Sequence, residues 1–124
     1  MKSTDLETSF SEKIKAGILT AWQEGHGGHA EKAHLLQGDD GIALLIPEAL
    51  YQAEIELSRD TIRGSHLLEE YLRTLVDSIS SELIPLIENF AGQEVAEIIP
   101  LIDIRAGWMI AFYRFKLRKK AGES

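Results

Sequence analysis

Three histidines beside a glycine-rich segment are the residues of this sequence best suited to chemistry. His26, His29 and His34 follow one another closely, with Glu31 among them. Imidazole nitrogens and a carboxylate are common ligands of zinc and nickel, and histidine also titrates near neutral pH, as a pH sensor would. The spacing matches no metal signature such as a His-x-x-x-His helix pair. We therefore expect no metal and no other cofactor, and interpret these residues as loop and surface histidines.

The same segment could hold an anion. Gly25, Gly27 and Gly28 would let consecutive backbone N–H groups converge on phosphate or bicarbonate. The segment lacks the Lys-Ser/Thr ending of a P-loop, and it follows a predicted helix, whereas nucleotide-binding glycine loops follow a strand. The alternative interpretation is a sharp turn from helix to strand.

A second group of polar residues precedes the predicted long helix. Arg59, Asp60 and Arg63 could form an anion pocket with Ser65 and His66. Charge pairing at a helix end on a solvated surface is the more ordinary alternative. The candidate ligand-binding residues of the two groups are His26, Gly27, Gly28, His29, Arg63, Gly64 and His66.

The sequence offers no catalytic constellation. Serine, histidine and aspartate all occur, but without a Gly-x-Ser-x-Gly elbow. Asp39 and Asp40 are adjacent carboxylates in a predicted turn, where solvation explains them. The absence of cysteine excludes disulfides, thiolate metal sites and a cysteine nucleophile. We predict that the protein is not an enzyme.

Length and charge limit the function further. The chain has 124 residues, 44% of them hydrophobic and 27% charged, which suffices for a single domain. We expect its core at about residues 5–117 and a basic tail at 118–124. A net charge of −7 argues against nucleic acid as a partner. Since there is neither a membrane-spanning apolar run nor a secretory signal, we expect a cytoplasmic protein.

Basic residues gather towards the C-terminal end of the chain. One interpretation is a solubilising tail, and the other is contact with an anionic surface such as lipid headgroups. Without an apolar anchor, such a tail gives at most weak, reversible membrane contact. The residues that would make this contact are Lys116, Arg118, Lys119 and Lys120.

The elements that must position these residues are predicted from hydrophobic spacing. Apolar residues recur at every fourth position from Phe10 to Trp22, which predicts an amphipathic helix over residues 4–23. Lys32–Gln37 and Gly41–Ile46 are extended runs joined by a Gly-Asp-Asp turn, which is typical of a β-hairpin. The second run is apolar on both faces, which predicts a central strand.

The middle of the chain is predicted to be helical. One helix covers residues 48–60, a break follows at 61–64, and a long helix covers residues 65–91. Pro85 interrupts the long helix, and Gly92 ends it. Its leucine and isoleucine side chains are spaced as in a heptad seam. That spacing favours core positions, with an intersubunit seam as the alternative.

The last third of the chain is predicted to be a second hairpin, formed by Val95–Ile102 and Trp108–Leu117. Pro100 cannot donate a ladder hydrogen bond, so we expect the first strand at an edge or with a bulge. We therefore predict an α+β fold with the element order α-β-β-α-α-β-β. Two hairpins would form a four-stranded, mostly antiparallel sheet, packed by the long helix and the N-terminal helix.

The final predicted strand is apolar on both of its faces, and a single layer of helices can cover only one of them. We therefore expect helices on one side of the sheet and a second copy of the chain, in a homodimer, on the other. The candidate interface residues are Leu72, Ile79, Leu83, Trp108 and Phe112.

Several passages occur in an order that is similar to a known family. Trp22–Gly28 is similar to a helix-ending Gly-Arg-Gly-Pro stretch, with His26 in the place of the arginine. The family has a strand that is followed by Leu-Thr, Glu and Leu-Ala. In this chain the extended run Gly41–Ile46 is similarly followed by Pro47–Leu50 and a predicted helix. Ile87–Val95 is similar to the pattern Ile-Glu-x-x-x-Gly-x-x-Val.

Gly64 and Leu68 fit a Gly-Arg-x-x-Val step into a long helix, where Ser65 replaces the arginine. Over about residues 10–117 the chain thus resembles MpsC, the small soluble component of bacterial membrane-potential-generating systems, and its relatives. The resemblance implies a non-enzymatic accessory or regulatory protein of a membrane system that handles cations or inorganic carbon. An integral-membrane transporter would be its partner. The alternative is a cytosolic module that senses or binds a small anion, bicarbonate or phosphate.

Overall fold

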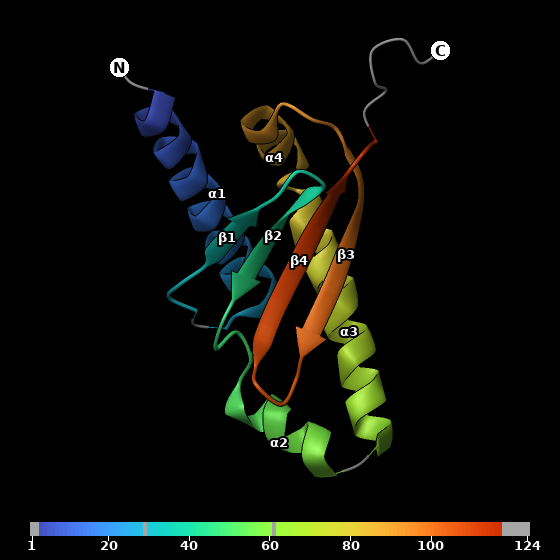
Figure 1. Cartoon of the computed structure of the whole chain (residues 1–124). Coiled ribbons are helices and arrows are strands. Elements are labelled where there is room, and N and C mark those ends of the chain that lie inside the picture. The colour runs from blue at the N-terminus through green and yellow to red at the C-terminus, as the bar shows by residue number, and fades with distance from the viewer. Residues whose placement is uncertain (1–2, 29, 61, 118–124) are drawn as a thin grey trace.

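In the computed structural model, one layer of helices lies against one sheet (Figure 1). The structure describes residues 3–28, 30–60 and 62–117. The helices are α1 (Ser3–His26), α2 (Gln52–Asp60), α3 (Ile62–Ser81) and α4 (Ile84–Ala91), and the strands are β1 (His34–Gln37), β2 (Gly41–Ile46), β3 (Val95–Asp103) and β4 (Trp108–Phe115). The predicted α+β class and the order of the elements are confirmed, with the long helix divided in two.

The sheet is antiparallel, with the strand order β1-β2-β4-β3. Its two hairpins are joined by β2 and β4, which pair from Gly41 opposite Arg114 to Ile46 opposite Met109. The central position predicted for β2 is therefore confirmed, as is the edge position that Pro100 predicts for β3. The one irregularity in the β3–β4 register occurs at Ala96, away from Pro100.

The core lies between the sheet and α1, α3 and α4, which cover the same face (Figure 1). Alternate side chains of β2 and β4 point into it, as expected for strands with one buried face. The fully buried side chains include Ile14, Ile18, Trp22, Ile42, Leu44, Ile46, Leu72, Val76, Ile87, Met109, Ala111 and Tyr113. The opposite face of the sheet carries no helix within the described part of the chain.

The end of α1 differs from its predicted position. The helix continues past Gln23, and Gly25 lies inside it, where an added Cβ would come within 3.0 Å of Cδ1 of Ile79. Gly27 has a φ of +83° and donates its backbone N–H to the Gln23 carbonyl at 2.9 Å, which ends the helix. The first of these glycines therefore allows α1 and α3 to approach closely, and the second stops the helix.

The predicted long helix is two helices. α3 ends at Ser81, and α4 begins with Leu83 as its N-cap and Pro85 in its first turn. A proline in the first turn loses no intrahelical hydrogen bond, because those N–H groups have no acceptor in the helix. The chain therefore starts a new helix at the proline instead of kinking the old one. Gly92 ends α4 in a left-handed conformation, as predicted.

The segment between β2 and α2 is also less helical than predicted. Glu48 has a φ of 54°, and the Ala49 N–H donates to the Gly107 carbonyl at 2.7 Å, so this segment joins the β3–β4 turn instead of the helix. α2 accordingly begins only at Gln52. α3 begins at Ile62, so residues 62–64 are helical where a break between helices was predicted. Residue 61 lies outside the described residues.

Tyr113 ties the sheet to α3. Its side chain is fully buried, and its hydroxyl donates a hydrogen bond of 2.9 Å to the backbone carbonyl of Ser80. Burial raises the pKa of the Tyr113 hydroxyl above its ordinary value, so the group stays neutral in the folded chain.

Replacing Tyr113 by phenylalanine should lower the free energy of unfolding by about 1–2 kcal/mol, because a buried hydrogen bond is lost while the ring remains. Urea denaturation followed by circular dichroism measures this change. Tyr71→Phe is the matched control, since Tyr71 lies exposed on α3, and should change the same quantity by no more than about 0.5 kcal/mol. Equal losses in the two variants would contradict the role given to Tyr113.

The raised pKa of Tyr113 also predicts a pH dependence. Below the unfolded-state pKa of about 10 the group is neutral in both states, and its contribution to stability is complete. As pH rises above that value, the unfolded chain loses the proton first, so the contribution is lost. The free energy of unfolding should therefore fall less steeply with pH in Tyr113→Phe than in the wild type. Parallel curves above pH ~10 would refute this assignment.

Candidate functional site

The histidine at the end of α1 is packed between two aromatic rings. The His26 ring stacks on Trp22 at a centroid distance of 4.4 Å and on Tyr51 at 5.0 Å, and its side chain is 2% exposed. Trp22 and His26 are four residues apart on α1, so they share one face of the helix. Tyr51 comes from the segment before α2, so the stack joins two elements.

A carboxylate holds the edge of the same ring. His26 Nε2 lies 2.9 Å and 3.1 Å from the two carboxylate oxygens of Glu54 in α2. One of these oxygens also accepts the backbone N–H of Tyr51 at 2.8 Å, which caps the first turn of α2. Trp22, His26, Tyr51 and Glu54 together are called the histidine clamp below.

Backbone contacts complete the histidine clamp. Trp22 donates its indole N–H to the Ala49 carbonyl at 2.9 Å, and the Tyr51 hydroxyl donates to the Gly27 carbonyl. The clamp therefore fixes the end of α1 against the connection between β2 and α2. All of its polar groups but one are used in holding these segments together.

The exception is His26 Nδ1, which is buried and has no hydrogen-bond partner in the described structure. An added Cβ on Gly28 would lie 2.5 Å from this nitrogen and 2.9 Å from the Ala49 carbonyl oxygen. A histidine oriented by a carboxylate is half of a general-base arrangement. Here the free nitrogen faces protein instead of solvent, so a substrate has no access to it, and the clamp is a structural device.

The predicted ligand-binding residues do not come together in one place. His26, Gly27 and Gly28 lie at the end of α1, whereas Arg63, Gly64 and His66 lie in the first turns of α3. The whole of α2 separates the two groups (Figure 1). His29 lies outside the described residues. Gly28 serves to make room for the His26 ring, and this explains the glycine without an anion.

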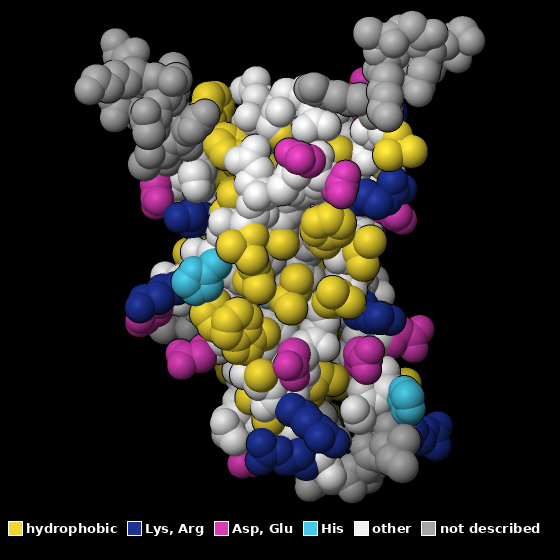
Figure 2. Space-filling model, viewed as in Figure 1, with side chains coloured by type: hydrophobic (Ala, Val, Ile, Leu, Met, Phe, Trp, Pro, Cys, Tyr) yellow, Lys and Arg dark blue, Asp and Glu magenta, His cyan; other side chains and the backbone are white. Residues whose placement is uncertain are grey.

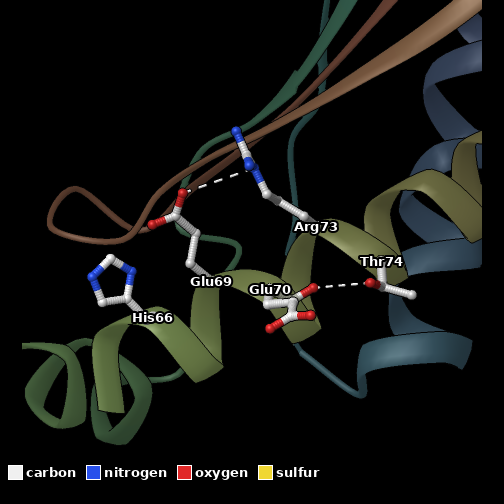
Figure 3. Close-up of a pocket in the computed structure, with 5 residues that line it drawn as sticks. All are labelled: His66, Glu69, Glu70, Arg73 and Thr74. Carbon is white, nitrogen blue, oxygen red and sulfur yellow. Dashed lines mark hydrogen bonds and ion pairs between the residues drawn. The ribbon is translucent and has the colours of Figure 1, made fainter. Parts of the chain in front are cut away.

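His66 lies beside a shallow, open depression on the surface of α3 (Figure 3). Arg73 Nε lies 3.8 Å from a carboxylate oxygen of Glu69, and the Thr74 hydroxyl donates to the Glu70 carbonyl at 2.9 Å. The residues that line the depression thus belong to one exposed helix surface, on which the Arg73 guanidinium already lies beside the Glu69 carboxylate. The charge pairing predicted for Arg59, Asp60 and Arg63 stays a prediction, because the ion pair at this surface joins other residues.

His34 and His26 also lie on opposite sides of the sheet. Leu35 packs against the core, so His34, its neighbour in β1, faces away from the helices and from His26. Within the described residues, no three His, Asp or Glu side chains are placed to hold a metal ion. The interpretation as loop and surface histidines fits His34 but is wrong for His26, which is a packed residue.

Two basic residues near the C-terminal end are paired with acidic residues. Lys116 Nζ lies 2.7 Å from a Glu94 oxygen, and Arg114 Nε lies 2.7 Å from a Glu97 oxygen. The hydrogen bond to Lys116 holds the pKa of Glu94 below its ordinary value. Arg118, Lys119 and Lys120 lie outside the described residues, so contact with a membrane surface remains a prediction. No helix in the described ranges is long and apolar enough to cross a membrane.

The face of the sheet away from the helices is apolar. The strand register places two rows of side chains across it. The first row is Leu36, Ala43, Phe112 and Ile99, and the second is His34, Leu45, Ile110 and Leu101. With Trp108 at one end, these residues form what we call the open face. Figure 2 shows it as a continuous apolar area over the four strands, with charged side chains above and below.

The open face is exposed towards its two edge strands and half-buried along its middle. Leu36 and Leu101 are 62% and 42% exposed. At one end of the face Arg114 pairs with Glu97, and at the other an Asp103 carboxylate oxygen accepts the backbone N–H of Ala106 at 3.1 Å. An apolar surface of this kind is suited to contact with another apolar surface.

The structure divides the predicted interface residues. Trp108 and Phe112 lie on the open face, as an interface requires. Leu72, Ile79 and Leu83 are 0%, 4% and 8% exposed and lie in the core of the chain itself, so their assignment to an interface is wrong. The heptad-like spacing reflects packing of α3 and its C-terminal end against α1 and the sheet.

Sequence reasoning missed the partners of His26. The four-residue spacing of Trp22 and His26 was a usable signal for a stacked pair, and Tyr51 and Glu54 have the three-residue spacing of a helix cap. Nothing in the sequence joins these two pairs, because they lie far apart in the chain and only the fold brings them together. No family model, no curated protein and no solved structure matches the chain.

Replacing Gly28 by alanine should lower the free energy of unfolding by about 1–3 kcal/mol, because the new Cβ must displace either His26 or the backbone at Ala49. Urea denaturation gives the free energy, and near-ultraviolet circular dichroism reports the loss of stacking on Trp22. Gly38→Ala is the matched control, since its nearest atom would lie 3.9 Å away, and should cost no more than about 0.5 kcal/mol. An unchanged spectrum in Gly28→Ala would contradict the packing of the clamp.

Proposed function

We propose that this chain is a non-enzymatic accessory protein that works by protein contact, in the cytoplasm, beside a membrane system that handles cations or inorganic carbon. The observation that carries contact as its mode of action is the open face, an apolar surface spanning four strands (Figure 2). The resemblance to the MpsC family supports the membrane system as the setting.

The composition of the open face favours a protein partner. Extended apolar patches are uncommon on soluble monomers and mark interaction sites when charged residues surround them. Trp108 and Phe112 are of the aromatic type that anchors protein interfaces. Both project from β4, a central strand held by ladders on both sides, so they are presented on a rigid support.

The polar groups of the chain give less support to catalysis. His26 with Glu54, a part-buried pair with the chemistry of a general base, is closed by Trp22 and Tyr51 and serves to join α1 to α2. The depression at His66 is an exposed helix surface. Contact through a surface therefore accounts for more of the described structure than a reaction would.

Deleting the chain from its own cells should lower the sodium-dependent membrane potential or the uptake of labelled bicarbonate, because the transport system loses its accessory. A potentiometric dye and isotope uptake measure the two quantities. Leu101→Glu, on the open face, should not restore them, whereas Leu67→Glu, a matched exposed leucine on α3, should restore them as the wild type does. Unchanged potential and unchanged uptake after deletion would refute the proposed setting.

The small-anion alternative has its own test. Calorimetric titration of the purified chain with bicarbonate and with phosphate should give no saturable heat, because His26, Arg63 and His66 do not share a site. Saturable binding that is lost in Arg63→Ala would favour the anion-binding module instead.

A further inference from the structure

We propose that the occupant of the open face is a second copy of this chain, so that two sheets stack face to face with their helical layers outside. The inference rests on the proposed function, in which the chain works by contact, and it names the partner at this surface.

The size of the open face suits this arrangement. β4 has eight residues and is ~26 Å long at about 3.3 Å per residue, and four strands about 4.8 Å apart span ~19 Å. The face therefore measures roughly 500 Å² in plan at most, before the relief of its side chains adds to the accessible area. Stable interfaces bury about 800 Å² on each partner. Because β1 and β2 are shorter than β4, the open face supplies at most about six-tenths of that area, and the relief of its side chains and the adjoining loops must supply the rest.

The charges near the open face favour a second copy over a strongly charged partner. Arg114 and Glu97 already neutralise each other, and Asp103 is engaged by the backbone at Ala106. Stacking two such faces therefore buries one charge pair that is already matched, while the Asp103 carboxylate keeps its negative charge at the exposed end of the face. An anionic membrane surface or a nucleic acid would instead meet a chain of net charge −7.

The aromatic anchors are held in place before any partner arrives. An added Cβ on Gly41 would lie 2.6 Å from the Phe112 ring, so this ring rests over the glycine of the neighbouring strand. Phe112 lies beside Ala43 and Ile110 beside Leu45 in the middle of the face. Under a two-fold axis through this point, the same rows would contact each other in the two copies, as sheets packed about 10 Å apart do.

Light scattering and sedimentation of the purified full chain at micromolar concentration test the proposal. The wild type and Leu67→Glu should have twice the 13.8 kDa mass of one chain, and Leu101→Glu should weaken association at least ~10-fold. Because each copy is acidic, added salt should tighten the dimer. A wild-type chain that stays monomeric at all salt concentrations would overturn the proposal.

A cross-linking experiment locates the interface. The chain has no cysteine, so Ile110→Cys introduces one thiol near the centre of the open face, and a short bismaleimide should join two copies. Thr20→Cys, on the exposed surface of α1, is the control that should not cross-link. A dimer that cross-links through Thr20→Cys but not through Ile110→Cys uses another surface and overturns the proposal.

Two outcomes separate this inference from the proposed function. A monomeric chain whose deletion still lowers bicarbonate uptake would refute the dimer and leave the accessory role standing. A dimer whose deletion changes neither uptake nor membrane potential would refute the accessory role and leave the dimer standing.

A vesicle experiment tests lipid as the occupant instead. Sedimentation of a monomeric chain with phosphatidylglycerol vesicles, lost in Leu101→Glu, would assign the open face to lipid and overturn the proposal.

Discussion

Pairing between β2 and β4 is the interaction on which the rest of the structure depends. These strands belong to hairpins that are far apart in the sequence, and their six-residue ladder makes one sheet of two small units. Once they pair, Ile42, Leu44 and Ile46 line up with Met109 and its neighbours on one face, and α1, α3 and α4 cover that face. The same ladder gathers other apolar side chains on the opposite face, which no helix of the described residues covers. The folded core and the exposed surface thus have a common origin.

Elements with local signals were predictable from the sequence, and elements set by tertiary contact were not. The period of α1 and the Gly-Asp-Asp turn gave those elements nearly their observed bounds. The division at Pro85 was less visible, because leucine and isoleucine spacing continues across it while the backbone does not. Glu48 is not helical because its neighbour Ala49 donates a hydrogen bond to Gly107, in a turn that is distant in the sequence. The sequence gives no local signal for this contact.

The candidate site shows the same division. Glycines beside a histidine suggested an anion cradle, but the structure gives them three separate uses: Gly25 for the approach of α3, Gly27 for ending α1, and Gly28 for the space of the His26 ring. The use of Gly25 depends on Ile79, which is distant in the sequence, whereas the uses of Gly27 and Gly28 depend on the local backbone and on the position of the His26 ring. Composition alone does not separate them. The two-sided apolar pattern of β4, by contrast, correctly located Trp108 and Phe112 on a surface that the helices leave uncovered.

The strand at the β3 edge bears on how large an assembly this chain can build. An edge strand offers unpaired backbone groups to any other chain, and long flat edges grow into fibres. β3 is the longer of the two edges, and Pro100, in register with Ala111 near its middle, removes a donor that an added strand would require. The opposite edge, β1, has only four residues. Growth by strand addition is therefore discouraged at both edges of the sheet, although one of its faces is apolar.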